Sequence, residues 1–205
     1  MSSLLERLNA LTPSEQVERS REALDFFRSE VRNLKITPQR FYKQTSLNKA
    51  TRFLEGRMYT FFYDPKTKDK LPYYDRFPVV FIVDATQNGF SALNLHYIPP
   101  RYRVRLLDEL YDLIITDDEE DDENMKTRIR MTYEILQSTA KLKFFRPCYK
   151  RYLTSHIEGR ALEIIPDYWD IMAMLPIAQF EKESVKKVYS ESIRSVNGWR
   201  KEKSN

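Results

Sequence analysis

Hydrophobic residues recur at helical spacing before residue 57 and after residue 100, and in an extended pattern between these points. Thr12 and Pro13 form a helix start signal, because threonine caps a helix well and proline suits its first position. With the apolar positions that follow, this signal predicts a helix over 13–34. Thr37-Pro38 repeats the signal, and the looser helix that it predicts ends at Gly56.

Residues 58–100 contain three segments typical of β-strands and are expected to nucleate the core. The segments 58–63 and 77–83 are rich in aromatic and β-branched residues, and apolar residues alternate with other residues in 90–98. Asn88-Gly89 can adopt positive φ, so it predicts a tight hairpin between the second and third strands. The stretch also holds ten of the 25 Tyr and Phe residues.

After Pro100 the pattern is again mainly helical. Helices are expected over 100–115, 125–142, 166–175 and 180–196. The acidic run 117–123 (DDEEDDE) should be a solvated loop, because adjacent like charges repel one another. Residues 149–157 are expected to form a helical turn or two, and 158–166 an edge strand that returns to the sheet. The basic tail over 197–205 is expected to be mobile.

These elements predict an α+β protein with either a small antiparallel sheet or an SH3-like barrel, an N-terminal helical arm and a helical insertion. The expected organisation is a helical arm over 1–56, an α+β core over 57–176 with the insertion at 100–157, and a C-terminal helix with a basic tail over 177–205. A chain of 205 residues is long enough to bury a sizeable core.

Charge is unevenly distributed along the chain. The net charge is +4, but the acidic run holds seven of the 30 acidic residues, so the remainder carries 34 basic against 23 acidic residues, or +11. Such a body favours polyanions or acidic protein surfaces, although basic residues that only solvate helix faces explain the count equally well. The single cysteine, Cys148, indicates a reducing compartment, and no apolar run has the length of a membrane span.

The sequence lacks a pattern typical of an active site, so we expect a non-enzymatic protein without a cofactor or a metal. His96 is expected on a strand, partly exposed or hydrogen-bonded, and His156 on a helix face; neither lies in a known nucleophile pattern. The four glycines form no phosphate-binding loop or dinucleotide fingerprint. The acidic run is too uniform to predict a defined metal cage.

Three segments interleave cationic and aromatic residues, as phosphate contact and base stacking both require. They supply the candidate contacts with a partner protein or a nucleic acid: Lys66, Lys68, Lys70, Tyr73, Tyr74 and Arg76 in the loop 64–76, then Arg101, Arg103 and Arg105, and finally Arg146, Lys150 and Arg151. The loop is long and charged, as functional loops often are. Tyrosine and arginine are equally enriched at protein interfaces, and half-buried core tyrosines with cations on the rim give the same pattern.

The motifs YDPK, LPYYDRFP, NLHYIPP and LLDELY, with PDYWDIMAMLPIAQF nearer the C-terminus, are distinctive. In these motifs the chain resembles a family of small virion or morphogenesis proteins of tailed bacteriophages, chiefly the T4-like phages with contractile tails. The resemblance implies a late-expressed protein of the neck, tail or baseplate, or one that acts at the ends of the packaged DNA. It would reside in the host cytoplasm during assembly and then in the virion. The acidic run has no counterpart in the resemblance.

The main hypothesis is therefore a non-enzymatic structural or assembly component of a tailed-phage particle. It would contact other virion proteins, without a membrane partner, and a symmetric oligomer within the particle is a further expectation. The alternative is a DNA-binding protein that acts at phage genome ends, in end protection or head completion. The +11 body and the interleaved arginines and tyrosines motivate this alternative. A third class, a hydrolase, would need convergent carboxylates.

Overall fold

The computed structural model describes residues 35–44, 47–100, 102–104, 106–107, 134 and 146–202. The helix expected over 13–34 and the acidic run lie outside these residues, as does most of the helices expected over 100–115 and 125–142. The described elements are, in chain order, α3 (Pro38–Gln44), β1 (Met58–Tyr63), η1 (Lys68–Lys70), β2 (Tyr74–Asp75), β3 (Val79–Thr86), β4 (Gly89–Asn94), η2 (Leu95–Tyr97), β5 (Tyr149–Leu153), η3 (Thr154–His156), β6 (Ile157–Ile164), η4 (Pro166–Tyr168), α6 (Trp169–Met174), β7 (Phe180–Glu181) and α7 (Val185–Glu202).

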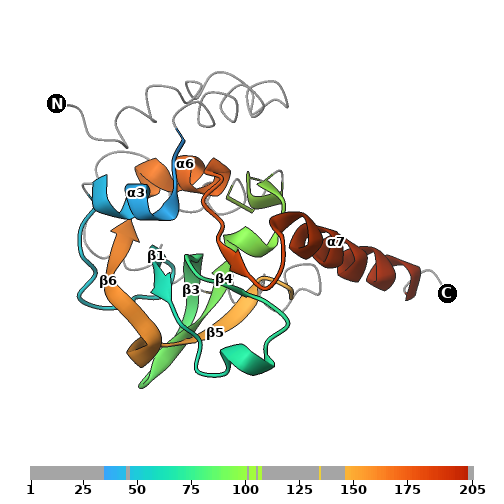
Figure 1. The fold of residues 1–205 in the computed structure, drawn as a ribbon, viewed down its shortest axis with the longest axis horizontal. Helices are drawn as coiled ribbons and strands as arrows, with labels where there is room; N and C mark the ends of the chain where they lie inside the picture. The colour runs from blue at the N-terminus through green and yellow to red at the C-terminus, as the bar shows by residue number, and fades with distance from the viewer. Residues whose placement is uncertain are drawn as a thin grey trace.

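Five antiparallel strands form the central sheet in the order β5-β4-β3-β1-β6 (Figure 1). The predicted α+β class with a small antiparallel sheet is thereby confirmed. The sheet is not closed, so the alternative of an SH3-like barrel is wrong: within the described part of the chain, β5 and β6 are the two edges and do not pair. Only η3 separates these edge strands in sequence, so the sheet must curl to bring their ends together.

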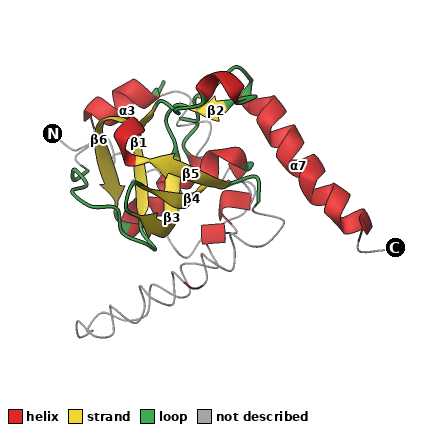
Figure 2. Cartoon of the chain, turned by 90° about the horizontal axis from the view of Figure 1, so that it is seen from below, coloured by secondary structure: helices red, strands yellow, loops and turns green. Residues whose placement is uncertain are grey.

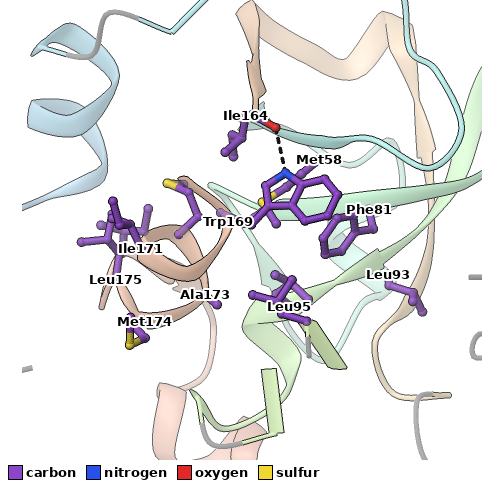
Figure 3. Packing of buried hydrophobic residues seen from close by; sticks show 14 of the residues in the cluster. Met58, Phe81, Leu93, Leu95, Ile164, Trp169, Ile171, Ala173, Met174 and Leu175 are labelled. Carbon is purple, nitrogen blue, oxygen red and sulfur yellow. Dashed lines mark hydrogen bonds between the residues drawn. The ribbon is translucent and has the colours of Figure 1, made fainter. Parts of the chain in front are cut away.

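Both faces of the sheet are buried in hydrophobic clusters. The short helix α6 covers one face, where the ring of Trp169 meets that of Phe81 edge-on at 4.8 Å (Figure 3). Nε1 of Trp169 donates a hydrogen bond to the carbonyl oxygen of Ile164, 2.9 Å away, so the indole is buried without losing its polar partner. The opposite face carries a second cluster that includes Tyr59, Phe61 and Phe90.

The hairpin predicted between β3 and β4 is present, with Thr86 paired with Gly89 across a two-residue loop. The loop residues are Gln87 and Asn88, and neither Asn88 nor Gly89 adopts the positive φ that the pair could have supplied. Gly89 is needed for a different reason: a Cβ at this position would lie 1.9 Å from the carbonyl oxygen of Tyr152 in β5. The glycine therefore permits the close approach of β4 and β5.

Four local predictions are corrected by the structure. The helix expected up to Gly56 ends at Gln44, and Lys49 forms a bridge with Leu162 of β6 instead. The segment expected as helical turns around Tyr149 is the strand β5, so the predicted insertion contains a strand of the core sheet. The third strand ends at Asn94, and residues 197–202 of the predicted mobile tail continue α7. This helix extends away from the sheet (Figure 2).

Candidate nucleic-acid interface

A cleft of about 690 Å³ opens between the loop that carries η1 and β2 and the edge strand β5. This volume lies within the range of about 300–1,000 Å³ that is usual for ligand sites. Its lining combines aromatic and cationic side chains from segments far apart in sequence. The tyrosines are Tyr63, Tyr73, Tyr74, Tyr97, Tyr149 and Tyr152, and the cations are Lys66, Lys150 and Arg151.

Three of the tyrosines that line the cleft, Tyr63, Tyr97 and Tyr152, are buried. The rings of Tyr63 and Tyr152 meet edge-on at 4.9 Å, and the hydroxyl of Tyr63 accepts a hydrogen bond from the backbone N–H of Leu153. Nζ of Lys150 lies 4.1 Å from the centroid of the Tyr97 ring, a cation–π contact. Burial raises the pKa of all three phenols and lowers the pKa of Lys150. The phenols are thus neutral hydrogen-bonding groups.

A buried polar network centred on Asp75 connects the elements that line the cleft. Oδ2 of Asp75 accepts hydrogen bonds from Nδ2 of Asn94 at 3.1 Å and from Nδ1 of His96 at 2.7 Å, and Oδ1 accepts one from the backbone N–H of Phe77 at 3.1 Å. Nδ2 of Asn94 also donates to the hydroxyl of Tyr152 at 3.0 Å. The network therefore fixes β2 against β4, η2 and β5.

Lys182 anchors the loop that forms one wall of the cleft. Its Nζ donates to the carbonyl oxygens of Lys68, Asp69 and Leu71 at 2.5, 3.2 and 2.9 Å. Lys182 lies just after β7, which pairs with β2, and its backbone adopts a positive φ of 72°. An ammonium group suits this position because it has three donors and the carbonyls at the end of a helical turn need partners.

The loop residues predicted as contacts divide into two groups. Lys66 and Lys70 are exposed and form no ion pair with another residue that the structure describes. Lys68 is paired with Asp64 at 3.0 Å, and Arg76 binds Glu158 at 2.5 Å and the carbonyl oxygen of Tyr63 at 2.7 Å. Lys68 and Arg76 thus stabilise the loop itself.

Both predicted loop tyrosines line the cleft, but in different surroundings. Tyr73 packs against Tyr97 with 5.9 Å between the ring centroids and against Phe180 with 6.1 Å. Tyr74 is half-buried, and its ring makes no ring contact within the described ranges.

The remaining predicted contacts differ sharply in burial. Arg103 is only 1% exposed, and its guanidinium donates to the carbonyl oxygens of Ile98 and Ala173 and to the hydroxyl of Tyr189. It stabilises the core and lies outside the cleft. Arg101 and Arg105 are outside the described residues. Arg146 is exposed just before β5, and Lys150 and Arg151 line the cleft.

The sequence identified two of the segments that build the cleft, the loop 64–76 and the segment around Tyr149, but did not predict that they lie side by side. Residues 149–152 face the loop because β5 pairs with β4 across the long insertion, and no local signal in the sequence reports that pairing. The anchoring roles of Asp75 and Lys182 were missed as well. The repeated tyrosines of LPYYDRFP and of the segment around Tyr149 were the only available signal.

The cleft lining is suited to binding a nucleic acid. The expected strand position of His96 is wrong, because it is fully buried in η2; His156 lies in η3, where its Nδ1 is 2.8 Å from the carbonyl oxygen of Asp64. Among the residues described, no three His, Cys, Asp or Glu side chains gather as metal ligands would. Within the same residues, no helix has both the length and the apolar character to cross a bilayer. Tyrosine rings offer stacking faces, and lysine and arginine neutralise phosphates.

Comparison with family models matches residues 28–196 to the model described as Phage T4 terminal DNA protecting protein. The match spans most of the chain and includes both walls of the cleft. No curated protein matches the chain, and no solved structure matches it.

Proposed function

The chain belongs to the Phage T4 terminal DNA protecting protein family, and from this premise we propose that it binds the ends of linear phage DNA and shields them. Two hypotheses came from the sequence: a particle component that acts through protein contacts, and a DNA-binding protein that acts at genome ends. The family supports the second better than the first. It agrees with the prediction of a non-enzymatic protein, since shielding an end requires binding and no chemical step. The resemblance to proteins of T4-like phages is thereby confirmed at the level of the family.

The structural observation that supports the proposal is the tyrosine-lined cleft with cations on both walls. Lys66 comes from the loop and Arg151 from β5, and both are exposed. Among the described residues of the lining, Asp75 is the only acidic one, and it is buried and accepts several hydrogen bonds from the protein itself. The described lining therefore presents positive charge without an exposed carboxylate, as a phosphate backbone requires.

A protein bound at a DNA terminus shields that terminus by occupying it. An enzyme that degrades DNA from its terminus must reach the terminal nucleotide, and a protein bound there blocks it sterically. We therefore place the protein with the packaged DNA in the virion, with DNA termini as its partner and virion proteins as further partners. The symmetric oligomer stays a prediction.

Protection of linear DNA from an exonuclease tests the proposal. The full-length protein should preserve linear duplex DNA, and its affinity for linear DNA should exceed that for a closed circle of the same sequence. The variant Lys66→Ala/Arg151→Ala should protect less. The control Arg52→Ala/Lys186→Ala removes the same charge from exposed positions outside the cleft lining and should protect normally. Equal affinity for linear and circular DNA, with no protection, would exclude end binding.

A further inference from the structure

We propose that the cleft holds unpaired nucleotides, so that the protein recognises a single-stranded overhang or a frayed end and not the paired duplex. This inference rests on the proposed function and names the chemical form of the end that the cleft accepts. The space between the loop wall and β5 is open, and no described residue fills it.

The concave shape of the site favours an unpaired strand. Proteins that read duplex DNA usually insert a helix or a β-ribbon into a groove about 12 Å wide, so the protein projects into the DNA. Here the protein is hollowed, and the ligand must enter a cleft of about 690 Å³. A base can do so only after it leaves the stack, and this costs least where the base is already unpaired.

Two tyrosine rings are available to stack against such bases. Tyr149 is 41% exposed, one of three large hydrophobic residues exposed to this degree in the described part of the chain. Neither Tyr149 nor Tyr74 makes a ring contact with another described residue, whereas Tyr63, Tyr97 and Tyr152 are buried and packed. Stacking on an aromatic ring tolerates any base, as an end-protecting protein needs.

The cations of the two walls are placed to contact the phosphates of the same strand. Lys66 and Arg151 form no ion pair with described residues, so binding phosphate would break no ion pair within the described part of the chain. A proline-rich peptide is the competing occupant, since aromatic grooves also bind such peptides. The uncommitted cations on both walls favour the nucleotide, because a polyproline segment carries no charge for them to neutralise.

DNA hairpins with one open end provide the test, since the loop removes the second terminus. Binding of the full-length protein is measured by fluorescence anisotropy with a blunt end, a three-nucleotide 5′ overhang and a three-nucleotide 3′ overhang. We expect at least one overhang to bind more tightly than the blunt end. Tyr149→Ala should weaken binding of that overhang by about 5- to 150-fold and reduce the difference between overhang and blunt ends. Tyr149→Phe keeps the ring and should bind normally.

The salt dependence provides a second, independent readout. Arg151→Ala should reduce the slope of log K against log salt concentration for the overhang by about 0.7, the value expected for one phosphate contact on a single strand. Lys186→Ala, an exposed lysine outside the cleft lining, should leave the slope unchanged. Circular dichroism of each variant establishes that it is folded.

Equal affinity for blunt and overhanging ends, or equal weakening of both by Tyr149→Ala, would overturn the inference. Displacement of the overhang by a proline-rich peptide but not by a trinucleotide would overturn it too. In these cases exonuclease protection would persist, and the proposed function would stand. Loss of every preference for ends would instead reject the proposed function itself.

Discussion

Oδ2 of Asp75 lies 2.7 Å from Nδ1 of His96, and both side chains are buried. Asp75 belongs to β2, in the loop that forms one wall of the cleft, and His96 belongs to η2 behind it. The shared hydrogen bond connects the wall to the central sheet. The protonation of His96 and the stability of the wall are therefore linked.

This link predicts that acid destabilises the protein through His96. Burial lowers the pKa of His96 below its usual value of 6.5; the nearby Arg103 also lowers it, and Asp75 raises it in part. Between the folded pKa and 6.5 the unfolded chain binds more protons than the folded one. The contribution of His96 to stability is therefore fully present above pH 6.5 and is lost as the pH falls toward the folded pKa. Over that interval the loss is about 1.4 kcal/mol for each pH unit.

Urea unfolding at pH 7.5, 6.5 and 5.5 measures this effect. His96→Gln retains a donor for Asp75 and does not titrate, so its free energy of unfolding should vary less with pH over this range than that of the wild type. An identical pH dependence in both proteins would assign the acid sensitivity to other groups.

The close contact between Gly89 and Tyr152 predicts that Gly89→Ala is strongly destabilising. The added Cβ would lie 1.9 Å from the carbonyl oxygen of Tyr152, so β4 and β5 would have to separate. We expect a loss of about 3 kcal/mol or more in the free energy of unfolding, beyond the usual 1–3 kcal/mol of overpacking. Ala85→Ser, at an exposed position of β3, is the control and should lie within about 0.5 kcal/mol of the wild type.

The Lys182 anchor predicts a local effect on the loop wall. Lys182→Met removes three hydrogen bonds to the carbonyls of residues 68, 69 and 71, and should cost about 1–2 kcal/mol of stability. Hydrogen exchange of the amides of residues 66–72 should become faster, and binding to DNA ends should weaken. Lys182→Gly also removes the ammonium but relieves the positive φ of 72°. If the glycine variant exchanges like the wild type, backbone conformation and not the ammonium holds the loop.

The strands that the sequence predicted well are those with strong local patterns. β1 is a short aromatic segment, β6 ends just before Pro166, and β3 and β4 are joined by a two-residue loop. β5 was missed because YKRYL is short and contains two adjacent cations, and its pairing with β4 is non-local. The cleft was missed as a unit for the same reason: its two walls meet only when β5 joins the sheet.

Arg103 shows why sequence alone could not sort the predicted contacts. In RYRVR it follows a tyrosine and has an arginine two residues away on each side, and in YKRY Arg151 lies between a lysine and a tyrosine, so both segments interleave cationic and aromatic residues. Yet Arg103 is 1% exposed and Arg151 is exposed in the cleft lining. Burial depends on tertiary packing against α6 and α7, through Ala173 and Tyr189, which no local pattern encodes.

The two arginines should therefore respond in opposite ways to substitution. Arg103→Met leaves the carbonyl oxygens of Ile98 and Ala173 without this buried donor, and should lower the free energy of unfolding by about 2 kcal/mol or more. Arg151→Ala removes an exposed side chain and should change stability by less than about 0.5 kcal/mol. The salt dependence of DNA-end binding should show the reverse, with the slope reduced in Arg151→Ala and retained in folded Arg103→Met. A reduced slope in Arg103→Met alone would mean that the phosphate-binding surface lies on the α6 side of the molecule and not in the cleft.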